Sequence, residues 1–190
     1  MKAKVTVGIS NNHLHLTLET FKKLFNKEEL TLKKKLNQIG EFACEETVTI
    51  KCNDQTLENL RIIGPFRPYD QIEVSKSNAR KLKINPPVRR SGDVKDSIPV
   101  TLIGPAGEVE LEEGVIIANR HVHFNLEDAK KYNVTNGQKL YIKINNEKSG
   151  IIEAEAKVSS NGFYELHIDT DDANAFLLNN NDEVEIFDEI

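Results

Sequence analysis

Alternation of hydrophobic and polar residues is the dominant pattern along this chain. Successive side chains of a β-strand point to opposite faces, so alternating runs predict half-buried strands. Such runs cover residues 4–10, 46–52, 71–75, 97–104, 139–144 and 182–187. We therefore predict a mainly β protein.

Two short amphipathic segments interrupt the strands and predict α-helices. They are residues 18–25 (LETFKKLF) and 126–132 (LEDAKKY). Thr17 and Asn125 precede them, and both residue types cap helix N-termini by accepting hydrogen bonds from free backbone N–H groups. Asp128, three residues after Asn125, resembles the second member of a capping box.

The chain contains an internal repeat. Aligned without a gap, residues 11–24 and 119–132 agree at seven of fourteen positions. The repetition predicts two similar β-barrel domains, each capped by short helices. Residues 85–97 (NPPVRRSGDVKDS), rich in Pro, Gly and charge, are the predicted boundary. We place the first barrel in residues 1–90 and the second in residues 91–190, and allow elements to be exchanged between them.

Composition limits the partners and the cellular location that we expect for the protein. The chain has 190 residues, with 30 acidic and 25 basic side chains, and this balance predicts no nucleic-acid partner. No apolar stretch is long enough to predict a membrane span. Two separate cysteines and an N-terminus without an apolar signal region favour a cytoplasmic protein. A homo-oligomer is compatible with the sequence, which does not determine the oligomeric state.

Four of the five histidines fall in two His-x-His patterns at corresponding positions of the repeat. They are His13 with His15, and His121 with His123. Residues i and i+2 of a strand share a face, so each pair can converge on a metal such as zinc. A single His-x-His is more often a polar strand face, but two copies in matching repeat positions favour metal binding.

Other residues near these patterns are candidates for the same site. His167 alternates with Leu166 and Ile168, so it shares the polar face of its predicted strand. Among carboxylates that could complete a zinc site we consider Glu45, Glu46 and Glu73, and prefer Glu73 because it is opposed to Ile72 and Val74. Arg67, six residues before Glu73, could hold a phosphate through two parallel hydrogen bonds.

Six motifs occur in an order that resembles the phosphate propanoyltransferase (PduL-type phosphotransacylase) family. They are GISNNHLHLT, GEFACEETVTI, GPFRPYDQIEVS, PVRRSGDV, EEGVIIANRHVHFNLEDA and ELHIDTDDANA. The resemblance covers nearly the whole chain. It implies two β-barrel domains with a dinuclear zinc site between them. It also implies reversible transfer of an acyl group between coenzyme A and inorganic phosphate.

The resemblance also assigns roles to individual residues. It implies that the metal ligands are His13, His15, Glu73, His121, His123 and His167. It implies that Arg67 is the catalytic, phosphate-binding residue, and that coenzyme A contacts Ile9, Ser10, Asn11, Arg61 and Asn174. Members of the family usually carry arginine where this chain has Asn12, whereas the second repeat keeps Arg120.

Two other functions stay open at this stage. One is a zinc-dependent thioester hydrolase, and the other is a non-catalytic metal-binding β scaffold. Cys44 could be proposed as an acyl carrier, but no base is adjacent in sequence, and a buried small hydrophobe is the better interpretation. Acetyl and propanoyl groups differ by one methylene, which the sequence does not resolve. The chain lacks an evident N-terminal extension of the kind that targets relatives to bacterial microcompartments, so we expect free cytoplasmic operation.

Overall fold

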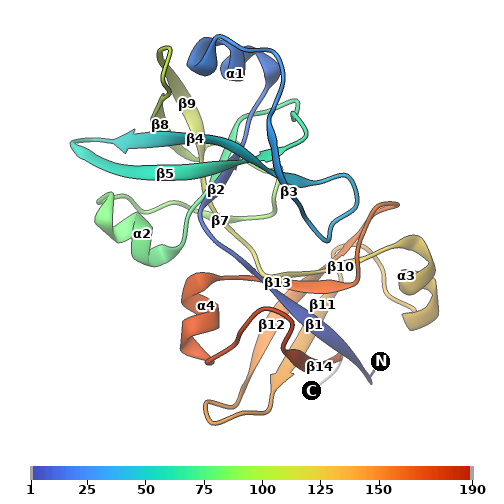
Figure 1. Ribbon diagram of the computed structural model, residues 1–190. Helices are drawn as coiled ribbons and strands as arrows, with labels where there is room; N and C mark the ends of the chain where they lie inside the picture. The colour runs from blue at the N-terminus through green and yellow to red at the C-terminus, as the bar shows by residue number, and fades with distance from the viewer. Residues whose placement is uncertain (1, 189–190) are drawn as a thin grey trace. The chain divides into compact units, whose positions relative to one another are not determined.

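The computed structural model describes residues 2–188 and divides the chain into two compact units (Figure 1). The split unit combines the N-terminal residues up to Asn11 with the residues from Asn119 onward. The continuous unit comprises Asn12–Ala118. Both are built mainly of strands with a few short helices, which confirms the predicted fold class.

The split unit is a closed barrel of six strands. The N-terminal strand β1 pairs in parallel with β13 and antiparallel with β14, so it closes the ring. Figure 1 shows this first strand lying among strands from the end of the chain. Around the ring the order is β1 (Lys2–Ser10), β13 (Glu165–Asp169), β10 (His121–Phe124), β12 (Gly150–Val158), β11 (Lys139–Ile144) and β14 (Glu183–Phe187).

Two helices of the split unit each follow a barrel strand directly. Helix α3 (Leu126–Tyr132) follows β10, and α4 (Thr170–Ala175) follows β13. The side chain of Asn125 accepts a hydrogen bond from the backbone N–H of Asp128, which satisfies one free donor at the start of α3. Inward-facing residues of the strands fill the barrel, among them Val7, Val122, Phe124, Leu140, Leu166 and Ile186.

The continuous unit also contains a closed ring of six strands. Pairings run from β4 to β5, β2, β6, β9, β8 and back to β4. Two further strands extend it, with β3 beside β4 and β7 beside β9. The bounds are β2 (His13–His15), β3 (Leu32–Lys35), β4 (Phe42–Cys52), β5 (Gln55–Gly64), β6 (Gln71–Glu73), β7 (Val88–Arg89), β8 (Ile98–Ile103) and β9 (Glu108–Ala118).

The helices of the continuous unit repeat the arrangement seen in the split unit. Helix α1 (Leu18–Phe25) follows β2 and begins after the N-cap residue Thr17, as predicted. Helix α2 (Lys76–Lys81) follows β6 and begins after Ser75. Each N-cap therefore lies two residues after the end of a strand that carries candidate ligands. The core of this unit contains Leu14, Leu16, Phe21, Leu24, Ile50, Ile62, Ile72 and Leu102.

The division between the units differs from the predicted boundary at residues 90 and 91. Residues 85–97 were expected to link two barrels, but β7 lies within this stretch and pairs with β9. Strands β8 and β9 in turn pair with β4 and β6, so the continuous unit extends to Ala118. Strand β1 belongs to the other unit because its partners are β13 and β14.

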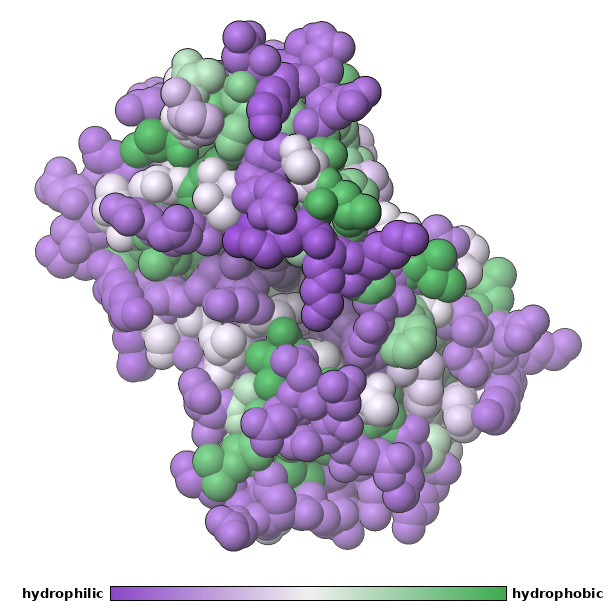
Figure 2. Space-filling model, in the orientation of Figure 1, coloured by the Kyte–Doolittle hydropathy of each residue, from purple (hydrophilic) through white to green (hydrophobic). Residues whose placement is uncertain are grey.

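Polar side chains dominate the surface. Figure 2 shows hydrophilic residues over most of the visible face of both units. The large exposed hydrophobic residues come from separate elements and loops: Leu18, Leu32, Leu36, Ile39, Val88, Leu126, Ile151, Phe163 and Leu177. Within residues 2–188, no helix has the length and apolar character needed to cross a membrane.

Candidate functional site

The six predicted metal ligands form two groups, one in each unit. His121, His123 and His167 form one group, and His13, His15 and Glu73 form the other. Within each group, the atoms that could bind a metal lie within 4.8 Å of one another. We call these groups the three-histidine cluster and the glutamate cluster.

Strand alternation builds both His-x-His pairs. Between the two histidines of each pair lies an apolar residue that points into a barrel core, Leu14 on β2 and Val122 on β10, both fully buried. Burial of the central residue orients the two imidazoles toward the opposite face. The core of each barrel therefore determines where its histidines point.

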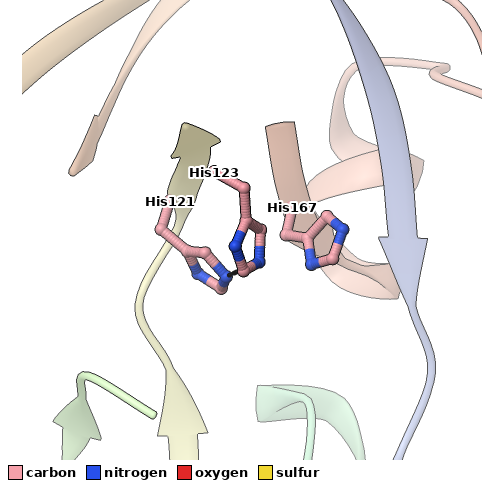
Figure 3. Close-up of side chains that lie close together, drawn as sticks. All are labelled: His121, His123 and His167. Atoms are coloured by element: carbon pink, nitrogen blue, oxygen red, sulfur yellow. Dashed lines mark hydrogen bonds between the residues drawn. The ribbon is translucent and has the colours of Figure 1, made fainter. Parts of the chain in front are cut away.

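The three-histidine cluster spans two antiparallel strands of the split unit. His121 on β10 lies opposite His167 on β13 in the strand register. Figure 3 shows the three imidazoles gathered together, with the ring of His123 between the other two. The Nε2 atoms of His121 and His123 are 3.0 Å apart. Ring centroids within the cluster are separated by 4.6 to 5.3 Å.

His121 and His167 each have one ring nitrogen in contact with a neighbouring oxygen. Nδ1 of His121 lies 2.8 Å from the backbone oxygen of Asn119, which favours a proton on Nδ1 and leaves Nε2 as the acceptor. Nε2 of His167 lies 2.7 Å from Oε2 of Glu165, a buried carboxylate two residues earlier on the same strand. Such contacts fix the orientation of an imidazole ligand.

The glutamate cluster has the same layout in the continuous unit. His13 on β2 lies opposite Glu73 on β6, and its Nε2 is 3.5 Å from Oε2 of Glu73. Nδ1 of His15 lies 3.0 Å from the backbone oxygen of Ile63, which leaves Nε2 of His15 available to a ligand. His15 is only 3% exposed and Glu73 9%, so the cluster is largely shielded from water.

A buried glutamine holds the carboxylate of this cluster. The Nε2 amide of Gln71 donates to Oε1 of Glu73 at 2.7 Å, and also contacts Oγ of Ser91 at 3.0 Å. Its Oε1 accepts a hydrogen bond of 2.6 Å from the backbone N–H of Gly92. The amide is thus fixed at both ends, which leaves the second oxygen of Glu73 facing His13.

Both clusters offer donor atoms of the types that zinc binds, and one pair of atoms in each has a spacing close to that of a tetrahedral site. Zinc accepts imidazole nitrogen and carboxylate oxygen at about 2.0–2.2 Å, which places two ligand atoms of one tetrahedral ion about 3.3 Å apart. The separations are 3.0 Å between His121 and His123 and 3.5 Å between His13 and Glu73, and the third ligand atom of each cluster lies within 4.8 Å of the other two. Each cluster supplies three ligands, the number typical of catalytic zinc, where a fourth position is open.

Arg67 lies in the continuous unit with its guanidinium already engaged. Its Nη2 donates to Oε1 of Glu41 at 2.6 Å, and its Nη1 donates to the hydroxyl of Tyr69 at 3.2 Å. The backbone N–H of Arg67 donates to the oxygen of Leu16, the residue after His15. The main chain at Arg67 is therefore attached beside the strand that carries the glutamate cluster.

The residue before each His-x-His pair bonds to the start of the helix that follows the other ligand-bearing strand. In the split unit, Arg120 forms two hydrogen bonds of 2.7 Å with the carboxylate of Asp172 in α4, and this pairing raises the pKa of Arg120. In the continuous unit, Oδ1 of Asn12 accepts a 3.0 Å hydrogen bond from the backbone N–H of Ser75, the N-cap of α2. Asn12, at the position of the repeat that corresponds to Arg120, thus keeps a connection but carries no charge.

The predicted coenzyme A contacts divide between the units. Ile9 and Ser10 end β1, Asn11 follows them, and Asn174 is an exposed residue of α4, all in the split unit. Ser10 pairs with Asp169, the N-cap of α4, so the end of β1 and this helix are neighbours. Arg61 lies on β5 of the continuous unit, where its Nη1 donates to the backbone oxygens of Cys44 and Glu45.

The alternative carboxylates, Glu45 and Glu46, and the thiol of Cys44 do not belong to either cluster. Glu45 is an exposed residue whose carboxylate contacts Lys33 at 3.2 Å. Glu46 is buried, and burial alone would raise its pKa. Hydrogen bonds from the hydroxyl and backbone of Thr31, from its own backbone and from Lys27 together lower the pKa instead. Cys44 is fully buried in the core, and burial raises the pKa of its thiol to about 11.

Three residues beside the candidate site were not found from sequence. They are Glu41, Gln71 and Glu165, which contact Arg67, Glu73 and His167 respectively. Gln71 and Glu165 each precede a predicted ligand by two positions on the same strand, so alternation could have placed them on the ligand face. Glu41 lies in the loop before β4, and no local pattern indicates its contact with Arg67.

Comparison with known proteins identifies the family of this chain. The phosphate propanoyltransferase family matches residues 6–179. A phosphate propanoyltransferase of Lachnoclostridium phytofermentans is 44% identical over 174 residues, 90% of this chain and 81% of that protein. Those of Shewanella putrefaciens and Thermotoga maritima are 41% and 40% identical over 90% and 96% of this chain, and 82% and 88% of their own lengths. With two units of matching design and a family match along most of its length, the chain belongs to the phosphate propanoyltransferase family of acyltransferases.

Proposed function

We propose that this protein transfers a short acyl group, acetyl or propanoyl, between coenzyme A and inorganic phosphate, with one zinc ion held in each cluster. The observation that carries the proposal is the pair of three-ligand clusters on matching strands of a phosphate acyltransferase. His13, His15 and Glu73 would hold one ion. His121, His123 and His167 would hold the other.

Bound zinc would supply a Lewis acid for the oxyanion of the attacked thioester and a preferred partner for the leaving thiolate. The protein contributes orientation of its ligands. Gln71 fixes the carboxylate of Glu73 from one side, and the backbone oxygens of Asn119 and Ile63 fix the rings of His121 and His15. Preorganised ligands need no rearrangement as the charge develops.

Arg67 would position phosphate as the nucleophile. Its planar guanidinium can donate two parallel hydrogen bonds to phosphoryl oxygens. Glu41 and Tyr69 hold the side chain in one orientation, at 2.6 and 3.2 Å. A phosphate oxygen would attack the thioester carbonyl carbon, the carbon–sulfur bond would break, and the products would be acyl phosphate and the thiolate of coenzyme A.

This route requires no acyl-enzyme. Cys44 would need to be an exposed thiolate to carry the acyl group, but it is fully buried and its thiol has a pKa of about 11. The five residues assigned to coenzyme A, namely Ile9, Ser10, Asn11, Arg61 and Asn174, remain part of the proposal. The proposal covers both acetyl and propanoyl groups as substrates.

The competing function is hydrolysis of the thioester by water, and Arg67 separates the two. Arg67→Ala should leave the zinc content unchanged and lower phosphate-dependent release of coenzyme A by about a hundredfold or more. Arg67→Lys should recover little, because an ammonium group lacks the planar two-point contact. Arg80→Ala, which removes an exposed arginine of α2 in the same unit, is the matched control and should retain activity.

The assay would follow consumption of acetyl- and propanoyl-coenzyme A at varied phosphate concentrations, together with formation of acyl phosphate. Wild-type rates that do not depend on phosphate would favour the hydrolase. An Arg67→Ala variant with unchanged phosphate dependence would remove Arg67 from the role proposed for it.

A further inference from the structure

Glu165 is a buried carboxylate that the proposed chemistry does not use. It is 5% exposed and lies on β13, two residues before His167 and on the same face of the strand. Its Oε2 is 2.7 Å from Nε2 of His167. A charged side chain is rarely buried unless another group engages it, so this contact calls for a specific role.

The strand beside this pair leaves room for it. Gly8 on β1 lies opposite His167 in the register, and Thr6 lies opposite Glu165. A Cβ atom at Gly8 would come within 2.8 Å of the Glu165 carboxyl group and 3.0 Å of Cδ2 of His167. The glycine therefore permits the close packing of the carboxylate and the imidazole against the barrel wall.

The contact determines which nitrogen of His167 can bind a metal. Glu165 occupies Nε2, so Nδ1 is the remaining donor atom. Figure 3 shows one ring nitrogen of His167 directed toward His123 and the other directed away from the cluster. The opposite holds for His121 and His15, in which a backbone oxygen contacts Nδ1 and leaves Nε2 available.

We propose that Glu165 is a positioning residue for the three-histidine cluster: its carboxylate accepts a hydrogen bond from Nε2–H of His167 and thereby presents Nδ1 of that ring to the metal. The inference rests on the proposed zinc site in the split unit. It assigns to Glu165 the function that Gln71 has beside Glu73, also at two residues before the ligand. The two partners match their ligands, since a carboxylate ligand receives a donor and an imidazole ligand receives an acceptor.

The first test is the tautomer of His167 in the zinc-loaded wild-type protein. Long-range proton–nitrogen correlation spectra distinguish the two ring nitrogens, and only five histidines need assignment. The proposal predicts a protonated Nε2 and a metal-bound Nδ1 for His167. A metal-bound Nε2 would overturn it, including the case in which Glu165 itself binds the ion.

The second test is zinc affinity, measured by competition with a chelator. Glu165→Ala should weaken binding to the three-histidine cluster by about ten- to a hundredfold, the usual effect of losing the partner of a ligand. Glu165→Gln should remain within a few-fold of wild type, because its amide oxygen can still accept a hydrogen bond from Nε2–H of His167. Unchanged affinity in Glu165→Ala would contradict the proposal.

Glu46→Ala is a matched control for the loss of a buried carboxylate. Glu46 is 7% exposed, close to the value for Glu165, but it binds Thr31 in the continuous unit. The Glu46→Ala variant should lower the free energy of unfolding without changing zinc affinity at the three-histidine cluster. A wild-type protein that binds no zinc would reject the proposed function itself, whereas zinc bound through Nε2 of His167 would reject only the role of Glu165.

Discussion

The glutamate cluster and the three-histidine cluster are built on the same succession of elements. In each, a His-x-His strand leads into a helix whose N-cap lies two residues after the second histidine, at Thr17 and Asn125. The third ligand lies on an antiparallel strand, opposite the first histidine. A second helix then begins after an N-cap two residues beyond the third ligand, at Ser75 and Asp169.

The clusters differ at the third ligand, and this difference changes their charge. Glu73 contributes a negative charge, whereas His167 is a neutral ligand when it binds a metal. Counting the ligands alone, without the Glu165 carboxylate beside His167, a divalent ion would leave a net charge of about +1 at the glutamate cluster and about +2 at the three-histidine cluster. A repeated backbone can thus place two ions of unequal electrophilicity, because the strand frame constrains the position of the ligand but not its type.

A second difference lies just before each His-x-His pair. Arg120 reaches Asp172, which is three residues after the N-cap of α4. The corresponding residue of α2, three after Ser75, is Asn78. The continuous unit therefore lacks both members of this ion pair. Because Asn78 stands where the split unit has Asp172, the absence of an arginine at position 12 leaves no unpaired carboxylate at position 78.

The largest expected effect comes from removing one histidine of either cluster. His13→Ala and His121→Ala should each lower acyl transfer by about a thousandfold, since a Lewis acid contributes several kcal/mol of stabilisation to the transition state. Each variant should also lose about one zinc ion per chain in elemental analysis. If either variant kept both its metal content and its activity, the altered histidine would not belong to a metal site.

The next largest effect concerns the unequal charge of the clusters. We expect the glutamate cluster to hold zinc at least about tenfold more tightly, a difference of roughly 1.4 kcal/mol, because its carboxylate attracts the cation directly. The paired variants test this expectation. At equilibrium, His121→Ala protein, which retains the glutamate cluster, should keep its remaining zinc at higher chelator concentrations than His13→Ala protein. The reverse order would show that ligand charge does not rank the two sites.

Short-range patterns in the sequence explain which parts of these clusters could be predicted. His13 and His15 share a face because strand side chains alternate, and Leu14 between them is buried as expected. The same alternation placed Glu73 and His167 among the candidate ligands. Helices after Thr17 and Asn125 began where their capping residues indicated.

Contacts between distant segments explain what the sequence did not reveal. The pairing of β1 with β13 and β14 joins the two ends of the chain, and no local pattern in β1 specifies these partners. The division between the units differs from the predicted boundary near residue 90 for the same reason, because Val88 and Arg89 pair with Ile117 and Ala118. The contact between Glu41 and Arg67 likewise depends on how a loop packs.

A smaller effect should follow from rebuilding the missing ion pair in the continuous unit. The double variant Asn12→Arg with Asn78→Asp should show a favourable coupling of about 1 kcal/mol in a double-mutant cycle of unfolding free energy, since the new side chains can pair as Arg120 and Asp172 do. Asn12→Arg alone should give no such gain. Strictly additive effects would show that the two repeats are not equivalent at these positions.

The smallest expected effect concerns a buried hydroxyl group in the split unit. The hydroxyl of Tyr164 in the split unit is buried and has no hydrogen-bond partner among residues 2–188, and burial raises its pKa. Tyr164→Phe should therefore be neutral or raise the free energy of unfolding by up to about 1 kcal/mol. Thermal unfolding would measure the change. A clear loss of stability would indicate that the hydroxyl makes a contact in solution.

Metal content is the most direct measurement of whether both clusters bind ions. Elemental analysis of freshly purified, active protein, supported by native mass spectrometry, should find about two zinc ions per chain, because six ligands exceed the four positions of one tetrahedral ion. Removal of the metal should abolish acyl transfer, and added zinc should restore it. Fully active protein without a bound transition metal would contradict the account.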